Sequence, residues 1–449
     1  MKDRIPGARV LVAGMARSGL GAVELLRGEG ARVAAADAKP LSQLPDAAAK
    51  LEQWNVPFLR EEEADFAAFD LVVLSPGVPC GAPPVLRARR AGVPVIGEAE
   101  LAGYYLQGPI LGITGANGKT TTTSLAGHLL RECGIPVQVG GNIGTPPTTM
   151  VAGSRPGQWN VLELSSFQLE TTAGFHARIA VALNVTPDHL DRHGSFEAYA
   201  QAKGRLFELQ QEGDFAVLNA ADPVCAGYAR LTPGQTVWFS SKAAAGRGAW
   251  LEGGRILFDG EALMDACEVP LRGLHNLENV MAAAAAARLA GAPLEGIAAA
   301  VRGFPGVEHR LEFVRTVRGV SFYNDSKATN VDATLKALDA FPGGVWIILG
   351  GKDKGSDYTP LRAPLQAKTK AVLLVGAAAE KIAGQVEGAA PLIRAGTLDR
   401  AVERAFAGAS AGDTVLLAPA CASFDQFTSY EHRGRVFKDL VAALTGEDR

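Results

Sequence analysis

Apolar runs of three to seven residues recur along the chain and alternate with longer stretches of helical periodicity. The runs are rich in valine, leucine and alanine and do not alternate with polar residues as half-exposed strands do. Such runs are typical of parallel strands buried on both faces, with helices between them. The clearest runs lie at residues 8–14, 32–37, 71–77, 109–111, 180–185, 345–351, 371–376 and 414–419. The pattern predicts an α/β protein with ligands at the carboxyl ends of its strands.

Two breaks in this pattern predict three domains. A chain of 449 residues usually forms two to four domains. The pattern restarts near Pro109 with a glycine-rich loop, and it restarts again after the glycine and proline segment 303–306. We therefore expect a Rossmann-like domain at 1–106, a central P-loop ATPase-like domain at 107–306, and a second Rossmann-like domain at 307–449.

Composition argues against several classes of protein. The net charge of −3 gives no support for binding nucleic acid or acidic membranes. The five cysteines are scattered without a Cys-x-x-Cys pair, which argues against a disulfide framework or a zinc site. The N-terminus lacks the apolar core of a signal peptide, and no run of about 18 apolar residues suggests a membrane span. We expect a cytoplasmic protein, and a monomer.

The strongest motif is Gly115-Ala116-Asn117-Gly118-Lys119-Thr120, which follows an apolar strand and precedes a helix-like run from Ser124 to Arg131. In a phosphate-binding loop, glycines let backbone N–H groups approach a polyphosphate, a lysine neutralises it, and a hydroxyl meets its Mg²⁺. Here the first glycine precedes the Gly-Lys-Thr by two residues rather than four. The alternative is a glycine-rich turn before an ordinary helix, which this strand and helix context disfavours. The motif predicts ATP binding through Gly115, Asn117, Gly118, Lys119, Thr120 and Thr121.

Three further residues are candidates for a metal site. Glu163 lies inside an apolar strand, where a carboxylate is costly unless it is paired or bound to metal. His189 follows the strand at 180–185 in a polar cluster, where ligands are expected. Lys203 falls on the helical stripe of Phe196, Tyr199 and Phe207, at a position expected to be apolar. A buried ion pair for Glu163, an isolated histidine, and a lysine that extends to water are the alternatives.

The first turn of the chain, Gly14-x-Ala16-x-x-Gly19, lacks the middle glycine of the dinucleotide fingerprint. That glycine admits a pyrophosphate, so NAD binding is disfavoured and another nucleotide fits as well. Asp37 ends the second strand and could accept a hydrogen bond from a ribose or a base, or it could be a surface acid.

Three asparagines are the remaining candidates in the central domain. Asn142 lies in the glycine-rich segment 140–144, which suggests close backbone approach to a ligand. Asn276 and Asn279 are three residues apart, so they share a helix face and could read the edge of a base. Alternatively, Asn276 caps that helix.

With these motifs in view, the chain resembles the Mur ligases, a family that belongs to one superfamily with the folylpolyglutamate synthetases. The phosphate loop, Glu163 and His189 match the superfamily's shared signatures. Resemblance to the branch that adds D-glutamate rests on the segments 163–170, 323–330 and 419–427. The Asp-Asn-Pro-Arg motif of the branch that adds meso-diaminopimelate is absent from the sequence.

The resemblance implies ATP-dependent ligation of D-glutamate to UDP-N-acetylmuramoyl-L-alanine through an acyl phosphate, in peptidoglycan and cell-wall synthesis. It implies two Mg²⁺ sites that use Thr120, Glu163, His189 and Lys203, with Lys203 carbamylated by CO₂. Catalytic roles fall to Lys119, Lys203, His189 and Glu163.

The resemblance also distributes the ligands over the domains. It implies UDP-substrate contacts at Arg17, Ser18, Asp37, Gly77 and Asn142. It implies nucleotide contacts beyond the loop at Asn276, Asn279, Arg310 and Asp325. For D-glutamate it implies Thr329, Lys354, Ser423 and Tyr430, where the family pattern has phenylalanine in place of Tyr430.

Two alternatives stay open at this point. The first is another ligase of the superfamily, which would add a different amino acid, or L-glutamate to folate. The second is an ATP-dependent switch that uses the loop without forming an amide bond. A switch needs no second metal, so the set of Glu163, His189 and Lys203 argues against it.

Overall fold

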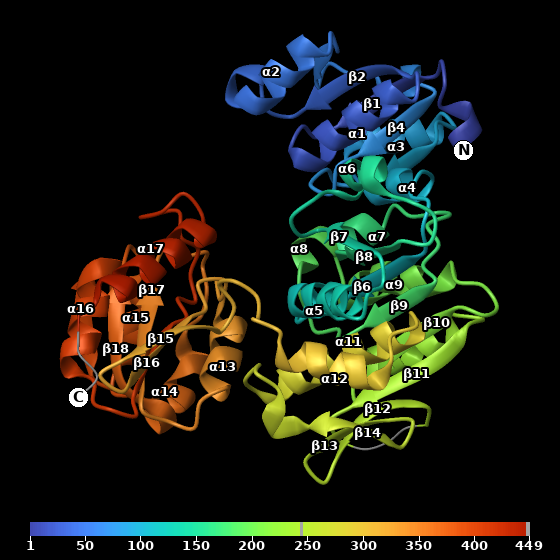
Figure 1. Cartoon of the computed structure of the whole chain (residues 1–449). Helices are drawn as coiled ribbons and strands as arrows, with labels where there is room; N and C mark the ends of the chain where they lie inside the picture. Colours follow the sequence, from blue (N-terminus) through green and yellow to red (C-terminus); the bar gives the residue numbers. More distant parts are fainter. Residues whose placement is uncertain (243–245, 446–449) are drawn as a thin grey trace. The chain divides into compact units, whose positions relative to one another are not determined.

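Three β-sheets with packed helices form the part of the chain that the computed structural model describes, residues 1–242 and 246–445 (Figure 1). The three sheets confirm the predicted α/β class. Contacts divide the chain into two compact units. One contains residues 1–270 and 275–304 with the first two sheets, and the other contains residues 271–274 and the chain from Pro305 onward with the third sheet. Within the described residues, no helix has the length and apolar character needed to cross a membrane.

The first sheet is parallel, with the order β3-β2-β1-β4-β5. Its strands are β1 Arg9–Ala13, β2 Arg32–Asp37, β3 Phe58–Arg60, β4 Leu71–Leu74 and β5 Val95–Gly97. Its helices are α1 Arg17–Gly28, α2 Pro45–Gln53, α3 Pro83–Arg90 and α4 Glu98–Gly103. The strand order changes direction between β1 and β4, and ligands bind at the carboxyl ends of strands at such a point.

The second sheet has the order β14-β13-β12-β11-β10-β9-β6-β8-β7. Its strands are β6 Ile110–Thr114, β7 Val137–Gly141, β8 Trp159–Glu163, β9 Ile179–Ala182, β10 Phe215–Asn219, β11 Gln235–Ser240, β12 Gly248–Glu252, β13 Arg255–Phe258 and β14 Glu261–Asp265. The helices are α5 Lys119–Glu132, α6 Pro147–Met150, α7 Ser166–Leu169, α8 Leu190–His193, α9 Phe196–Glu208, α10 Pro223–Gly227, α11 Leu274–Leu289 and α12 Leu294–Arg302. Strand β6 lies between β8 and β9 in the sheet, and the phosphate loop follows it.

The third sheet has the order β15-β16-β20-β17-β18-β19, with only β15 antiparallel. Its strands are β15 Glu312–Val317, β16 Val320–Asn324, β17 Val345–Gly350, β18 Thr369–Val375, β19 Leu392–Gly396 and β20 Thr414–Leu417. The helices are α13 Val331–Asp339, α14 Arg362–Lys368, α15 Ala379–Val386, α16 Leu398–Gly408 and α17 Tyr430–Ala443. Because β16, β20 and β17 are parallel neighbours, the loops after them meet at one edge of the sheet.

Three element boundaries differ from the prediction. Helix α5 begins at Lys119 rather than Ser124, so the phosphate loop leads directly into the first helical turn. Glu163 is the last residue of β8 rather than an interior one, which places its carboxylate at the edge where ligands bind. Helix α11 begins at Leu274, before Asn276.

Candidate functional site

The loop between β6 and α5 has the geometry of an anion site. Gly118 has φ +85°, and a Cβ at this position would lie 2.3 Å from Asn279 Oδ1, so glycine is required. The Lys119 ammonium bends back and donates to Gly115 O at 2.8 Å and to Ala116 O at 2.9 Å. The N-terminus of a long helix, its backbone N–H groups and a lysine therefore lie together, as phosphate binding requires.

Glu163 links this loop to a second glycine-rich segment. Its Oε2 accepts a hydrogen bond from Thr120 Oγ1 at 2.8 Å, and its Oε1 accepts one from Asn142 Nδ2 at 2.9 Å. Only 2% of Glu163 is exposed. Thr120, Glu163 and Asn142 therefore lie in contact, and they present hydroxyl, carboxylate and amide oxygens, which are the ligands that Mg²⁺ prefers. Their roles as metal and substrate ligands stay predictions.

Lys203 is buried on α9, with 1% of its surface exposed. Its ammonium donates to Gly115 O at 2.9 Å and lies 4.6 Å from the centre of the Tyr199 ring. The interpretation of Lys203 as a lysine that extends to water is therefore wrong. Burial holds the pKa of Lys203 well below its ordinary value, and the charge of Lys119 lowers the pKa further.

His189 stands apart from these contacts. It has φ +52°, its ring centre lies 4.8 Å from that of Phe167, and its Nε2 lies 3.5 Å from Asp188 Oδ2. Among the described residues, no group of three or more histidine, cysteine and acidic side chains is arranged to hold a metal ion. The role of His189 as a metal ligand stays a prediction.

Asn276 and Asn279 lie behind the phosphate loop. Asn279 Nδ2 donates to Asn276 Oδ1 at 3.0 Å, and Asn279 Oδ1 accepts a hydrogen bond from Thr122 Oγ1 at 3.3 Å. Both side chains are buried. Since α11 begins at Leu274, Asn276 lies inside the helix and the interpretation as a cap is wrong. Contact with a base stays a prediction.

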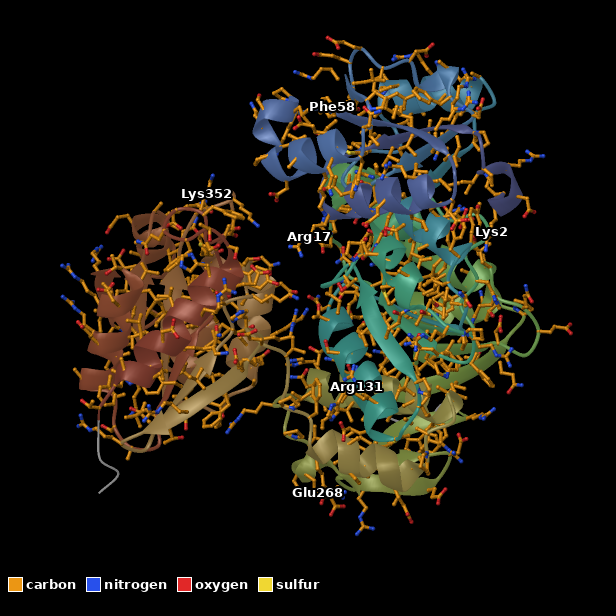
Figure 2. All side chains as sticks on the ribbon, turned by 45° about the horizontal axis from the view of Figure 1, so that its top comes forward. Lys2, Arg17, Phe58, Arg131, Glu268 and Lys352 are labelled. Atoms are coloured by element: carbon orange, nitrogen blue, oxygen red, sulfur yellow. The ribbon has the colours of Figure 1, made fainter. Side chains whose placement is uncertain are left out.

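The N-terminal turn is held by Asp37. Its carboxylate accepts hydrogen bonds from Met15 N at 2.7 Å and from Lys39 N at 2.8 Å, so it fixes the backbone beside the first turn. Arg17, labelled in Figure 2, begins α1 and is exposed. With Lys50 and Thr149 it lines a cavity of about 450 Å³, which is the size of a ligand pocket.

Two further residues predicted to contact the UDP-linked substrate lie in the same region. Ser18 is half-buried in the first turn of α1, and Gly77 follows β4. The Gly77 carbonyl accepts a long hydrogen bond from Arg192 Nη1 at 3.4 Å, and the Val78 carbonyl accepts one from Arg192 Nη2 at 2.9 Å.

In the C-terminal unit, Arg310 and Asp325 interact electrostatically. Burial raises the pKa of Asp325 to about 6, and the charge of Arg310 opposes that increase. Arg310 Nε is buried without a hydrogen-bond partner in the described part of the chain. The two residues therefore lie near each other, and their contact with a nucleotide stays a prediction.

Thr329, Lys354 and Ser423 follow β16, β17 and β20, respectively. Backbone hydrogen bonds join these loops: Ala420 N donates to Ala328 O at 2.9 Å, and Lys352 N donates to Ala422 O at 2.8 Å. Lys352, labelled in Figure 2, is exposed at the start of its loop. The three predicted residues thus belong to joined loops at one edge of the sheet.

Tyr430 begins α17 beside the same edge. Its carbonyl accepts a hydrogen bond from Ser326 Oγ at 2.8 Å, and the Lys327 ammonium lies 5.9 Å from the centre of its ring. Arg433, three residues further on, was not singled out from the sequence. It lies four and eight residues before the buried Phe437 and Val441, the same periodic signal that identified Lys203.

Three protein-family models together match most of the chain. Models described as Mur ligase MurD-like N-terminal domain, Mur ligase middle domain, and Mur ligase glutamate ligase domain match residues 8–97, 113–287 and 309–421, respectively.

The chain is also similar to curated proteins over their full length. It is 60% identical to the UDP-N-acetylmuramoylalanine–D-glutamate ligase of Solibacter usitatus, over 99% of this chain and 100% of that one. Identity to the protein of the same name from Acidobacterium capsulatum is 52%, over 98% of each chain.

Solved structures with the same fold include the UDP-N-acetylmuramate–alanine ligase of Thermotoga maritima. The TM-score is 0.62 at 18% identity, over 97% of this chain and 99% of that one. A pseudomurein peptide ligase type C from Methanothermus fervidus gives a TM-score of 0.59 at 18% identity, over 98% and 100% of the two chains.

Proposed function

Since this chain belongs to the Mur ligase family, we propose that it joins D-glutamate to UDP-N-acetylmuramoyl-L-alanine with hydrolysis of ATP to ADP and phosphate. Relatives of 60% and 52% identity carry the name of that ligase and match over their full length. The observation that carries the proposal is the joined set of Lys119, Thr120, Glu163 and Asn142, which combines a polyphosphate site with oxygen ligands for Mg²⁺.

A carboxylate is a poor electrophile, so the reaction needs two steps. The alanine carboxylate attacks the γ-phosphorus of ATP, the bond to ADP breaks, and an acyl phosphate forms. The amine of D-glutamate then attacks the acyl carbon, phosphate leaves, and the amine loses a proton. Two anions meet in the first step, so catalysis depends on positioning and opposing charge. Lys119 supplies one such charge beside the helix N-terminus.

The donor set fits Mg²⁺ at the end of β8. Thr120 and Glu163 would hold one ion, and His189 with a carbamylated Lys203 would hold a second. When bound, Mg²⁺ offsets the charge of the phosphates and of the carboxylate. A bare ammonium would repel a cation, whereas a carbamate presents oxygens. The burial of Lys203 and its lowered pKa support this modification, because only a neutral amine adds to CO₂.

The remaining proposed ligand contacts are divided between the two units. In the first, Arg17, Ser18, Asp37, Gly77 and Asn142 would bind the UDP-linked substrate, and Asn276 and Asn279 would contact the adenine. In the second, Arg310 and Asp325 would face the nucleotide, and the joined loops would present Thr329, Lys354, Ser423 and Tyr430 to D-glutamate. The enzyme would act in the cytoplasm, where ATP is available.

The test is release of phosphate by the purified protein with ATP, Mg²⁺ and UDP-N-acetylmuramoyl-L-alanine. We expect release with D-glutamate and little with L-glutamate, and a product that contains a new amide bond by mass spectrometry. Release with another amino acid but not with D-glutamate would contradict the substrate, and no release with any amino acid would contradict the reaction.

A further inference from the structure

A buried arginine in the C-terminal unit has no role in the site described so far. Arg433 lies in the first turns of α17, and 2% of its surface is exposed. Burial lowers the pKa of its guanidinium to about 10, and the charge of Asp425 opposes that decrease. Among the described residues, no carboxylate lies within ion-pair distance of the guanidinium. A buried charge without a carboxylate in direct contact is costly unless hydrogen bonds satisfy it, so the hydrogen bonds of Arg433 decide what it does.

The guanidinium donates to two loops at once. Arg433 Nε donates to Ser326 Oγ at 2.9 Å, and Nη2 donates to Ser326 O at 2.8 Å. Nη1 and Nη2 each donate to Cys421 O at 3.2 Å. Ser326 follows β16 and Cys421 follows β20, so one planar group joins the ends of two neighbouring strands. Only the rigid fork of arginine offers donors in this arrangement.

Both loops carry residues of the candidate site. Ser326 lies between Asp325 and Thr329, and Cys421 lies two residues before Ser423. Ala420 has φ +58°, a conformation that is unfavourable for alanine. Such a backbone persists only where the surroundings hold it. The hydrogen bonds from Arg433 to the adjacent Cys421 carbonyl contribute to that constraint, together with the hydrogen bond from Ala420 N to Ala328 O.

We propose that Arg433 is a positioning residue for the incoming amino acid, because its guanidinium fixes the loops that carry Thr329 and Ser423 relative to each other. The inference rests on the proposed function, which makes these loops the D-glutamate site. Arg433 acts through the loops and does not itself react.

Kinetics of Arg433→Met and Arg433→Lys test this role. Methionine has a similar length but no donors, so we expect the KM for D-glutamate to rise about tenfold or more. Lysine keeps the charge and can reach one acceptor, so its KM should lie between those of Arg433→Met and the wild type. The KM for the UDP-linked substrate should stay unchanged, because its predicted contacts belong to the other unit.

Phe437→Leu is the matched control. Phe437 is buried in the hydrophobic core one turn further along α17. The Phe437→Leu substitution should lower the melting temperature without a change in the KM for D-glutamate. If Arg433→Met behaves in the same way, or raises every KM equally, Arg433 is only structural and the proposal is wrong.

Arg433→Ala with added ethylguanidinium tests the guanidinium itself. We expect ethylguanidinium, but not ethylammonium, to lower the KM of this variant for D-glutamate towards the wild-type value. If both cations lower the KM equally, or if neither lowers it, the proposal is wrong. The wild-type enzyme is assayed in parallel. If the wild type is inactive with D-glutamate, the proposed function is wrong. If the wild type is active and the KM of Arg433→Met for D-glutamate is unchanged, only this inference is wrong.

Discussion

Two lysine ammonium groups meet at one carbonyl oxygen in the central domain. Gly115 O accepts hydrogen bonds from Lys119 Nζ at 2.8 Å and from Lys203 Nζ at 2.9 Å. Like charges at this separation repel, and the more deeply buried amine loses its proton more easily. The lowered pKa of Lys203 marks it as the amine that, in our proposal, reacts with CO₂, while Lys119 faces the phosphates.

Lys203→Ala tests this division of roles. We expect the activity of the variant to fall by about 10²-fold or more, because the proposed ligand for a second Mg²⁺ is lost. Short carboxylic acids such as acetate should restore part of the activity, because a carboxylate can occupy the space of the carbamate. Phosphate release measured against acid concentration is the readout.

Lys203→Arg is the control for this rescue. Arginine keeps a charge, cannot be carbamylated and fills the same space, so it should be inactive with and without acetate. Equal rescue of both variants, or no rescue of Lys203→Ala, would contradict a carbamate at this position.

At the scale of elements, the strands could be predicted from the sequence, but which strands become neighbours in a sheet could not. Buried parallel strands produce continuous apolar runs, so β1, β2 and β6 could be read from the sequence. Lys203 could be identified because a charge interrupts a helical stripe. The hydrogen bonds of Arg433 to two loops could not, since they depend on which strands become neighbours. Asn276 was ambiguous because a helix start only three residues earlier turns a cap into an interior position.

The contact between α4 and α6 contains a titratable group. Glu98 begins α4, and its Oε1 accepts hydrogen bonds from Thr148 N and Oγ1, each at 2.8 Å. Its Oε2 is buried without a hydrogen-bond partner in the described part of the chain. Burial raises the pKa of Glu98 from 4.5 to about 7. Below about pH 7 the folded protein therefore favours the protonated acid.

This shift makes stability depend on pH. Between pH 4.5 and about 7 the unfolded chain ionises Glu98 while the folded chain keeps the proton, so stability falls as the pH rises. Glu98→Gln cannot ionise and should become more stable relative to wild type across this window, by up to about 3 kcal/mol above pH 7. Denaturant unfolding at pH 5 and pH 8 measures the difference.

Glu52→Gln removes an exposed acid from α2 and is the comparison for this experiment. If the stability difference between Glu98→Gln and wild type is the same at pH 5 and pH 8, Glu98 is ionised throughout. The assignment of a protonated acid between α4 and α6 would then be wrong.

At the scale of the whole molecule, the chain passes between its two units after Pro270, after Leu274 and after Phe304. The segment 271–274 thus belongs to the C-terminal unit, although the residues on both sides of it belong to the other. Its Arg272 guanidinium lies 5.1 Å from the centre of the Tyr323 ring and 5.6 Å from that of Phe341. We infer that this cation–π contact attaches the segment to the C-terminal unit.

Arg272→Ala should therefore increase local opening in the C-terminal unit and leave the other unit unchanged. An exposed cation–π contact contributes about 0.5–1 kcal/mol, so local opening around Tyr323 should become about two- to fivefold more frequent. Hydrogen exchange of β16 should accelerate by that factor, while exchange of β6 in the other unit should not change. Arg272→Lys keeps a cation over the rings and should exchange nearly as slowly as wild type. Equal acceleration in β6 and β16 would mean that the units open together, and unchanged exchange in β16 would mean that the segment is attached by other contacts.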